Sequence, residues 1–159
     1  MLSWLTSTTI GRIIATFVIS MFPIVELRAG IPYGIGFGLR PIVAMLAAMA
    51  GNLLPIPFIL LLLDKILDFM KKQRGILGKA ANWLESKAYK NQATIEKYKA
   101  LGLIILVAIP LPGTGAWTGA LVATVLRINR KTAFPCIVIG VIIAGIVVTI
   151  LSTGVKALI

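Results

Sequence analysis

The sequence contains no histidine and a single cysteine, Cys136, which lies in an apolar run. The absence of histidine removes the commonest metal ligand and the usual general base. One cysteine excludes a disulfide framework and a thiolate cluster. No nucleophile–base pair, carboxylate pair or metal-ligand spacing occurs elsewhere in the sequence. We therefore expect a protein that is not an enzyme and that holds no metal or other cofactor.

Acidic residues are also scarce. The sequence has five acidic residues and 16 lysines and arginines, so the net charge is +11 and the pI is about 10.3. In a soluble protein this excess would suggest nucleic-acid binding. Here most of the charge falls in one segment between apolar stretches, which the positive-inside rule of membrane proteins explains better. We expect no nucleic-acid partner.

Apolar residues, in contrast, make up 58% of the 159 residues, and the mean hydropathy is +0.99. A soluble domain of this size leaves about a third of its surface exposed to water and could not hide so much apolar surface. We predict an all-α integral membrane protein with a single domain over residues 1–159. It would be a multi-pass protein of the cell membrane, the prokaryotic inner or plasma membrane, in contact with membrane lipid.

Two uncharged segments are long enough to cross a bilayer, at Pro41–Leu63 and Ala133–Val155. Each has roughly the 20 apolar residues that a spanning helix needs. Helix-breaking and polar residues interrupt the first segment, so we expect a kink or a locally unwound turn there. These residues are Gly51, Asn52, Pro55 and Pro57.

Two other apolar segments are each broken near the middle into two short arms. A helical arm of about 10 residues is roughly 15 Å long, which is half of a roughly 30 Å hydrocarbon core. The simplest interpretation is a pair of re-entrant helical hairpins, and the alternative joins the arms of each into one kinked spanning helix. The arms are Ile13–Phe22 and Ile31–Leu39 around Pro23 and the ELR run Glu26–Arg28, then Leu101–Ile109 and Ala116–Leu126 around the PLPGTG run Pro110–Gly115.

The two halves of the chain resemble each other. Matching positions are Pro23, Arg28 and Gly30 in the first half and Pro112, Trp117 and Gly119 in the second. Small residues recur every four positions after each break, a spacing typical of close helix packing in lipid. They are Gly30, Gly34 and Gly38, then Gly115, Gly119 and Ala123. A hairpin followed by a spanning helix therefore occurs twice, as a first repeat over 1–63 and a second over 100–159.

A single span between the hairpins would place them on opposite faces, as an inverted repeat of the form that many secondary transporters use. The linker Asp64–Lys99 carries nine basic and four acidic residues. It is typical of an amphipathic helical segment on the membrane surface, and a plain solvated linker is the alternative. The positive-inside rule places the linker in the cytoplasm and both termini outside.

Glu26 and Arg28 are the only charged residues expected near the membrane midplane. A charge there costs from about 2.5 to over 10 kcal/mol, so it usually marks a substrate path or proton relay. Pro23, Gly30 and Pro32 favour an extended turn, which would place both charges on one side. Glu26 is the candidate for proton coupling. The alternative is a neutralised structural pair that locks the hairpin tip.

Two half-helix N-termini are expected to face each other near the midplane. One would begin near Pro32, and the other after Gly113, Thr114 and Gly115, with Thr114 as a possible N-cap. Their free amides favour an anionic group such as a phosphate or carboxylate. The alternative is that the glycines only permit close packing.

Two further residues are candidates to line this site. Asn52 is a polar group inside an apolar span, so it would bond to a hairpin tip or line the site. Trp117 would wall the site or simply pack against its neighbours.

The motifs ELRAGIP at Glu26–Pro32, GN at Gly51–Asn52 and IPLPGTGAWTGAL at Ile109–Leu121 resemble the putative small multi-drug export protein family. The arrangement is also similar to the DedA/VTT superfamily, whose members have two opposed re-entrant hairpins and are implicated in moving lipids, including undecaprenyl phosphate. By that resemblance, Glu26 and Arg28 match the acidic and basic residues of the first hairpin. At the second hairpin those proteins carry arginines, whereas this chain has Pro112, Gly113 and Trp117.

Three functions follow as hypotheses. The first is a transporter or flippase for an amphipathic substrate with an anionic, lipid-phosphate type head group, coupled to protons. The second is a proton-driven exporter of small toxic compounds. The third is a structural or assembly protein that docks partners through Asp64–Lys99. Because one chain has few polar residues to line a pathway, we expect a homodimer.

Overall fold

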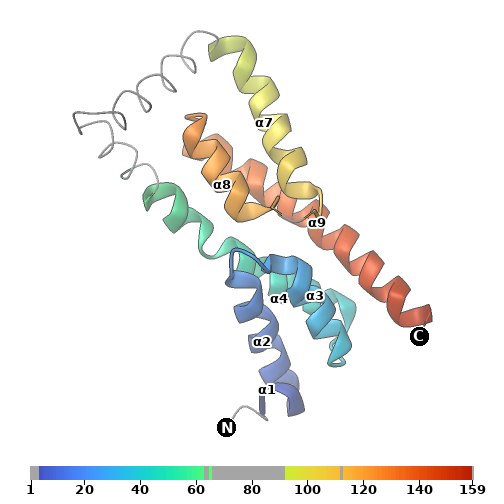
Figure 1. Cartoon of the computed structure of the whole chain (residues 1–159). Helices are drawn as coiled ribbons and strands as arrows, with labels where there is room; N and C mark the ends of the chain where they lie inside the picture. The colour runs from blue at the N-terminus through green and yellow to red at the C-terminus, as the bar shows by residue number, and fades with distance from the viewer. Residues whose placement is uncertain (1–3, 63–64, 66–91, 112, 159) are drawn as a thin grey trace.

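The computed structural model describes residues 4–62, 65, 92–111 and 113–158, and every regular element among them is a helix (Figure 1). Two of the helices are long and apolar enough to cross a membrane, Pro41–Leu62 and Arg130–Val155. The predicted spans are therefore confirmed as helices, the second beginning three residues earlier than expected. The predicted amphipathic character of the linker falls largely outside the described residues.

The first hairpin consists of α2 (Thr9–Met21) and α3 (Glu26–Gly36), preceded by the short helix α1 (Trp4–Ser7). Thr8 caps α2, because its hydroxyl accepts a hydrogen bond from the Gly11 amide at 3.1 Å. Figure 1 shows α2 running from one end of the molecule to its middle and α3 returning to the same end.

Helix α4 (Pro41–Leu53) begins with proline at its first position. The missing amide costs no hydrogen bond there, because the first amide of a helix has no acceptor within the helix. The helix breaks at Leu54–Pro55 and resumes to Leu62. Pro55 and Pro57 lack the amides that would bond to the carbonyls four residues before them. The predicted kink is therefore confirmed at the predicted place.

The second half contains α7 (Gln92–Ala108), α8 (Ala116–Val125) and α9 (Arg130–Leu158). Figure 1 shows α7 running from the opposite end to the middle, α8 returning to that end, and α9 crossing back to the end where α1 lies. Helix α7 begins inside the predicted linker, so Gln92–Lys99 continues the first arm of the second hairpin.

Both hairpins end in the same backbone motif. After α3, the Leu39 amide donates to the Gly34 carbonyl, and Gly38 has a φ of +91°. After α8, the Ile128 amide donates to the Ala123 carbonyl, and Arg127 has a φ of +54°. These are Schellman caps, in which a left-handed residue closes the helix. They match in the register that pairs Gly30 with Gly119.

The same pairing of positions between the two halves is found where the spanning helices cross the hairpins, at Gly51 and Gly140. A Cβ on Gly51 of α4 would lie 2.9 Å from the carbonyl carbon of Phe17 in α2. A Cβ on Gly140 of α9 would lie 2.6 Å from the Cβ of Val107 in α7. Each spanning helix therefore touches the first arm of its own hairpin at a glycine. Gly30 and Gly119, which belong to the two small-residue faces, lie against Ser20 and Val107, so these faces also pack inside the chain.

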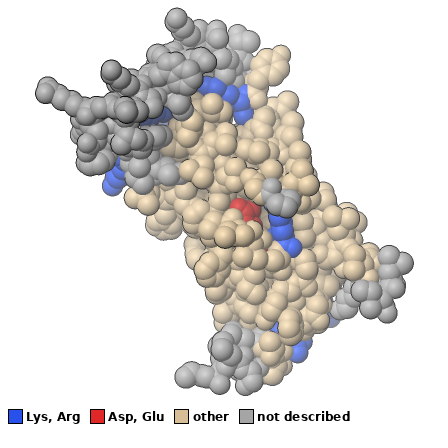
Figure 2. Space-filling view, viewed as in Figure 1, with Lys and Arg blue, Asp and Glu red and all other residues tan. Residues whose placement is uncertain are grey.

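The surface between the two ends is apolar. Ile24, Ile10 and Phe58 are 95%, 70% and 68% exposed, and many other large apolar side chains are also open. Figure 2 shows this as a broad uncharged surface with basic side chains near the two ends and one small charged spot in the middle. A surface of this kind belongs in lipid, and the chain is a membrane protein.

Candidate functional site

Glu26 opens α3 at the tip of the first hairpin and is the only acidic residue outside 64–99. Its side chain is 3% exposed, and its φ is +48°. A residue with a Cβ pays about 1–2 kcal/mol for this left-handed conformation. Such a conformation persists only when the surroundings of the residue hold it in place. The contacts of the carboxylate show what holds Glu26.

The Glu26 carboxylate accepts hydrogen bonds from the first two amides of α8. The donors are the N–H groups of Ala116 at 3.3 Å and Trp117 at 3.2 Å. Helix α8 has no side-chain cap of its own, because its N-cap residue is Gly115. Glu26 therefore caps α8 from the other half of the chain, and its charge complements the positive end of the helix dipole.

Gly115 makes this contact possible. Its φ is +128°, and a Cβ there would lie 2.7 Å from Glu26 Cδ and 2.8 Å from Glu26 Oε1. Only glycine satisfies both the backbone conformation and the space. Gly113 has a φ of +82° but is exposed and has nothing within 4 Å of a Cβ position, so it shapes the loop without touching Glu26.

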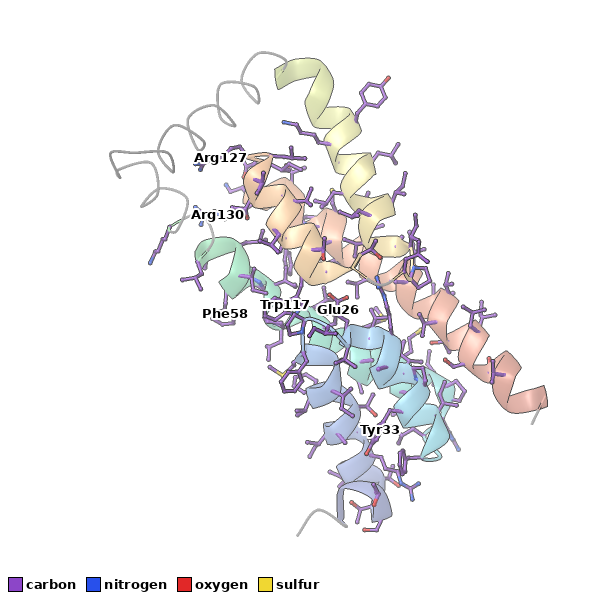
Figure 3. The ribbon with its side chains drawn as sticks, in the orientation of Figure 1. Glu26, Tyr33, Phe58, Trp117, Arg127 and Arg130 are labelled. Carbon is purple, nitrogen blue, oxygen red and sulfur yellow. The ribbon has the colours of Figure 1, made fainter. Side chains whose placement is uncertain are left out.

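Arg28 binds the other end of the second hairpin. Its Nη2 donates to Thr114 Oγ1 at 2.7 Å and to the Ile109 carbonyl at 3.2 Å, and its Nη1 donates to the Leu111 carbonyl. These acceptors follow the C-terminus of α7, where the helix dipole is negative. The two charges of the first tip therefore bind the two helix ends of the second tip, and Figure 3 shows Glu26 and Trp117 meeting in the middle of the molecule.

Three details differ from the sequence-based expectation. The ELR run is the first turn of a helix, so α3 begins at Glu26 and Pro32 lies inside it. Glu26 and Arg28 consequently reach different targets, and the expected extended turn is wrong. Thr114 is not the N-cap of α8, since its hydroxyl lies 2.6 Å from the Ile109 carbonyl and 2.8 Å from the Leu111 carbonyl.

Trp117 contacts the first hairpin twice. Its backbone amide donates to Glu26, and its indole Nε1 donates to the Met21 carbonyl at 3.2 Å. Both bonds cross between the halves of the chain. The half-buried Trp117 therefore connects the two tips.

Asn52 is fully buried in α4, and its amide lies close to the Glu26 carboxyl. Neither its Nδ2 nor its Oδ1 has a hydrogen-bond partner among the described residues. A buried amide without a partner loses about 1–3 kcal/mol of hydration. An unpartnered polar group in a native fold calls for an explanation, such as a ligand, a water or a catalytic role.

An open groove of about 770 Å³ lies beside the tips. Among the described residues that line it, Arg28 is the only charged one, and the rest of this lining is almost entirely apolar. The wall is formed by Arg28, Pro32, Ile35 and Gly36 of α3, Pro110, and Val148, Leu151, Ser152 and Val155 of α9. The sequence did not predict the α9 residues of the wall. An apolar side chain of a spanning helix can face either a groove or lipid, and the sequence does not distinguish the two. The polar residue Ser152 could have indicated the groove.

The structure thus brings Glu26, Arg28, Asn52, Thr114, Gly115 and Trp117 to one place. The family model of the putative small multi-drug export proteins matches residues 26–147. The chain belongs to this family. The match begins at Glu26 and includes both hairpin tips and most of α9. No curated protein and no solved structure matches the chain.

Proposed function

We propose that this membrane protein is a transporter that moves an amphipathic compound with an anionic head group. The observation that carries the proposal is the apolar groove that ends at Arg28. Ligand sites are concave and mostly apolar, with a few polar groups that fix the orientation of the ligand. The apolar part of the substrate would lie between α3 and α9, with its head group toward Arg28. A lipid phosphate is a substrate of this type.

In the proposed transport cycle the two hairpins are re-entrant and form an inverted repeat. The paths of α2–α3 and α7–α8 from opposite ends, and their matching caps, support this arrangement. The contact between the tips closes the centre of the membrane. Separation of Glu26 from α8 and of Arg28 from the α7 carbonyls would open it, as repeats that rock against each other do in other transporters.

Glu26 is the proposed coupling residue for protons. Its bonds to the two amides of α8 are charge-assisted, and such bonds are about twice as strong as neutral ones. Protonation of Glu26 would remove the charge and weaken the contact between the tips. A proton that binds Glu26 would then drive the opening step.

A second candidate is proton-driven export of small toxic compounds, which the description of the family favours. The two candidates differ in the charge of the substrate. A cationic compound would be bound by Glu26, which does not line the groove, and an anionic compound by Arg28, which does. The groove therefore favours the anion. A non-transport role in membrane assembly lacks an observation of this kind.

We further propose a multi-pass protein of the prokaryotic cell membrane with 64–99 in the cytoplasm. A homodimer stays a proposal that rests on the few polar residues of one chain. The small-residue faces lend it no support, because they pack inside the chain.

Flux measured in proteoliposomes tests the proposal. We expect Arg28→Ala to abolish uptake of an amphipathic anion, and Glu26→Gln to remove its dependence on a proton gradient. Ile150→Ala, at an open apolar position of α9, is the control and should transport normally. Unchanged flux in both tip variants, or flux of cations alone, would contradict the proposal.

A further inference from the structure

We infer that Glu26 is an internal stand-in for the oxyanion of the substrate, and that its place at the N-terminus of α8 is the head-group subsite. The inference rests on the proposed function and deepens it. It states where the head group binds and which residue must leave first. The groups around the Glu26 carboxylate carry the argument.

The place that Glu26 occupies has the donors of an oxyanion site. Two backbone amides of α8 point at one carboxylate, at 3.2 and 3.3 Å. Helix α8 has 10 residues, and its N-terminus has no other cap. Arg28 adds a full positive charge nearby. Amides, a helix dipole and a guanidinium together favour a carboxylate or a phosphate.

Asn52 is the independent sign of a ligand. Its side chain is fully buried close to the Glu26 carboxyl, yet neither amide atom has a hydrogen-bond partner among the described residues. A phosphate has more acceptor oxygens than the Glu26 carboxylate, and one of them could accept from Asn52 Nδ2. The unpartnered donor is explained if the native occupant of this site is larger than the Glu26 carboxylate.

The backbone of Glu26 fits a group that must leave. Its φ of +48° is strained for any residue with a Cβ, so release of the carboxylate from α8 lets the tip relax. The contact is therefore held by the anion site and opposed by the local backbone. An incoming oxyanion that binds the same amides would displace Glu26 and separate the tips.

The experiment removes the stand-in and supplies a free anion. The purified full-length chain, with Trp4 and Trp83 changed to Phe, reports binding of formate or inorganic phosphate through Trp117 fluorescence. In Glu26→Gly the side chain is gone and glycine tolerates the positive φ. We expect this variant to bind either anion about tenfold more tightly than the chain with Glu26, against chloride at equal ionic strength.

Two further variants separate a vacated site from a change in charge. Glu26→Gln keeps the site filled by a neutral side chain, which binds the α8 amides more weakly than a carboxylate does, so its gain in affinity should be much smaller than that of Glu26→Gly. A gain equal to that of Glu26→Gly would overturn the inference, as would no gain in Glu26→Gly. Asn52→Leu in the glycine background should lose most of the gain. If the glycine variant does not fold, Glu26→Asn tests the same point, since asparagine also tolerates positive φ.

Nanodiscs distinguish a soluble oxyanion from a lipid head group. Glu26→Gly in phosphatidylcholine discs with and without phosphatidic acid shows whether a lipid phosphate reaches the site, by competition with inorganic phosphate. Flux keeps the two proposals apart. Transport of an amphipathic anion without anion binding in Glu26→Gly overturns only this inference. Anion binding without transport overturns only the proposed function.

Discussion

At the residue scale, one glycine decides whether the two hairpin tips can meet. Gly115 combines a φ of +128° with a position against the Glu26 carboxylate. The sequence marks this residue only as one of several small residues. The contact with Glu26 makes it the one that no other residue type can replace at this tip.

Gly115→Ala is expected to destabilise the chain by about 2 kcal/mol, because the added methyl group meets Glu26 and the backbone is strained for alanine. The midpoint of thermal unfolding in detergent measures the effect. Gly102→Ala is the matched control, since Gly102 lies in α7 with nothing within 4 Å of a Cβ position. The Gly102→Ala variant should be up to about 1 kcal/mol more stable than the native chain, because alanine favours a helix more than glycine does. Equal midpoints for both variants would exclude the close contact at Gly115.

Asn52 illustrates a conflict between stability and function at a single side chain. Asn52→Leu should stabilise the chain by about 1 kcal/mol, because a buried amide without a partner is replaced by an apolar group of similar size. Flux of the proposed anionic substrate should fall in the same variant. Unfolding midpoints and proteoliposome flux are measured together. A loss of stability would mean that Asn52 is hydrogen bonded in the membrane.

At the element scale, the two halves are built by the same local rules. Each hairpin closes with a Schellman cap, and each spanning helix contacts the first arm of its hairpin at a glycine. Helices in lipid gain little from the hydrophobic effect, so close backbone approach at small residues holds them together. The repeated glycines therefore mark packing inside each half.

Gly51→Ala tests this packing. The added Cβ would meet the Phe17 backbone, which cannot move aside as a flexible side chain can, so we expect a loss of about 2 kcal/mol. Gly140→Ala, at the matching position against α7, should lose a similar amount. Gly154→Ala has nothing within 4 Å and serves as the control. Titration with denaturing detergent measures all three. Tolerance of alanine at Gly51 and Gly140 would contradict the internal packing.

At the scale of the whole molecule, the paths of the helices predict which ends face opposite sides of the membrane. Helix α1, which contains Ser7, and the first turn of α9, which contains Thr132, lie at opposite ends of the molecule (Figure 1). In a Cys136→Ala background, Ser7→Cys should react with an impermeant maleimide in intact cells. Thr132→Cys should react only after permeabilisation. The native chain should stay unlabelled, because Cys136 is buried. Labelling of both thiols from one side would exclude the proposed topology.

The sequence by itself determined the membrane class, the two spans, the kink before Pro55 and the register that relates the halves. These features follow from local properties: apolar length, proline and glycine positions, and the spacing of small residues. The breaks at 22–25, 109–111 and 113–115 were also predictable, since Pro23 and Pro110 remove backbone donors there. A proline alone does not decide a break, because Pro32 and Pro135 lie inside α3 and α9.

Only the tertiary structure decided what Glu26 and Arg28 bind. Apart from the Thr114 hydroxyl, their partners are backbone amides and carbonyls of the other tip, about 80 to 90 residues away in the chain. Every residue except proline carries the same backbone donor and acceptor, so the sequence contains no mark that singles these out. The start of α3 at Glu26 could not be predicted from the sequence for the same reason. The left-handed turn there is held by long-range contacts and opposed by local preference.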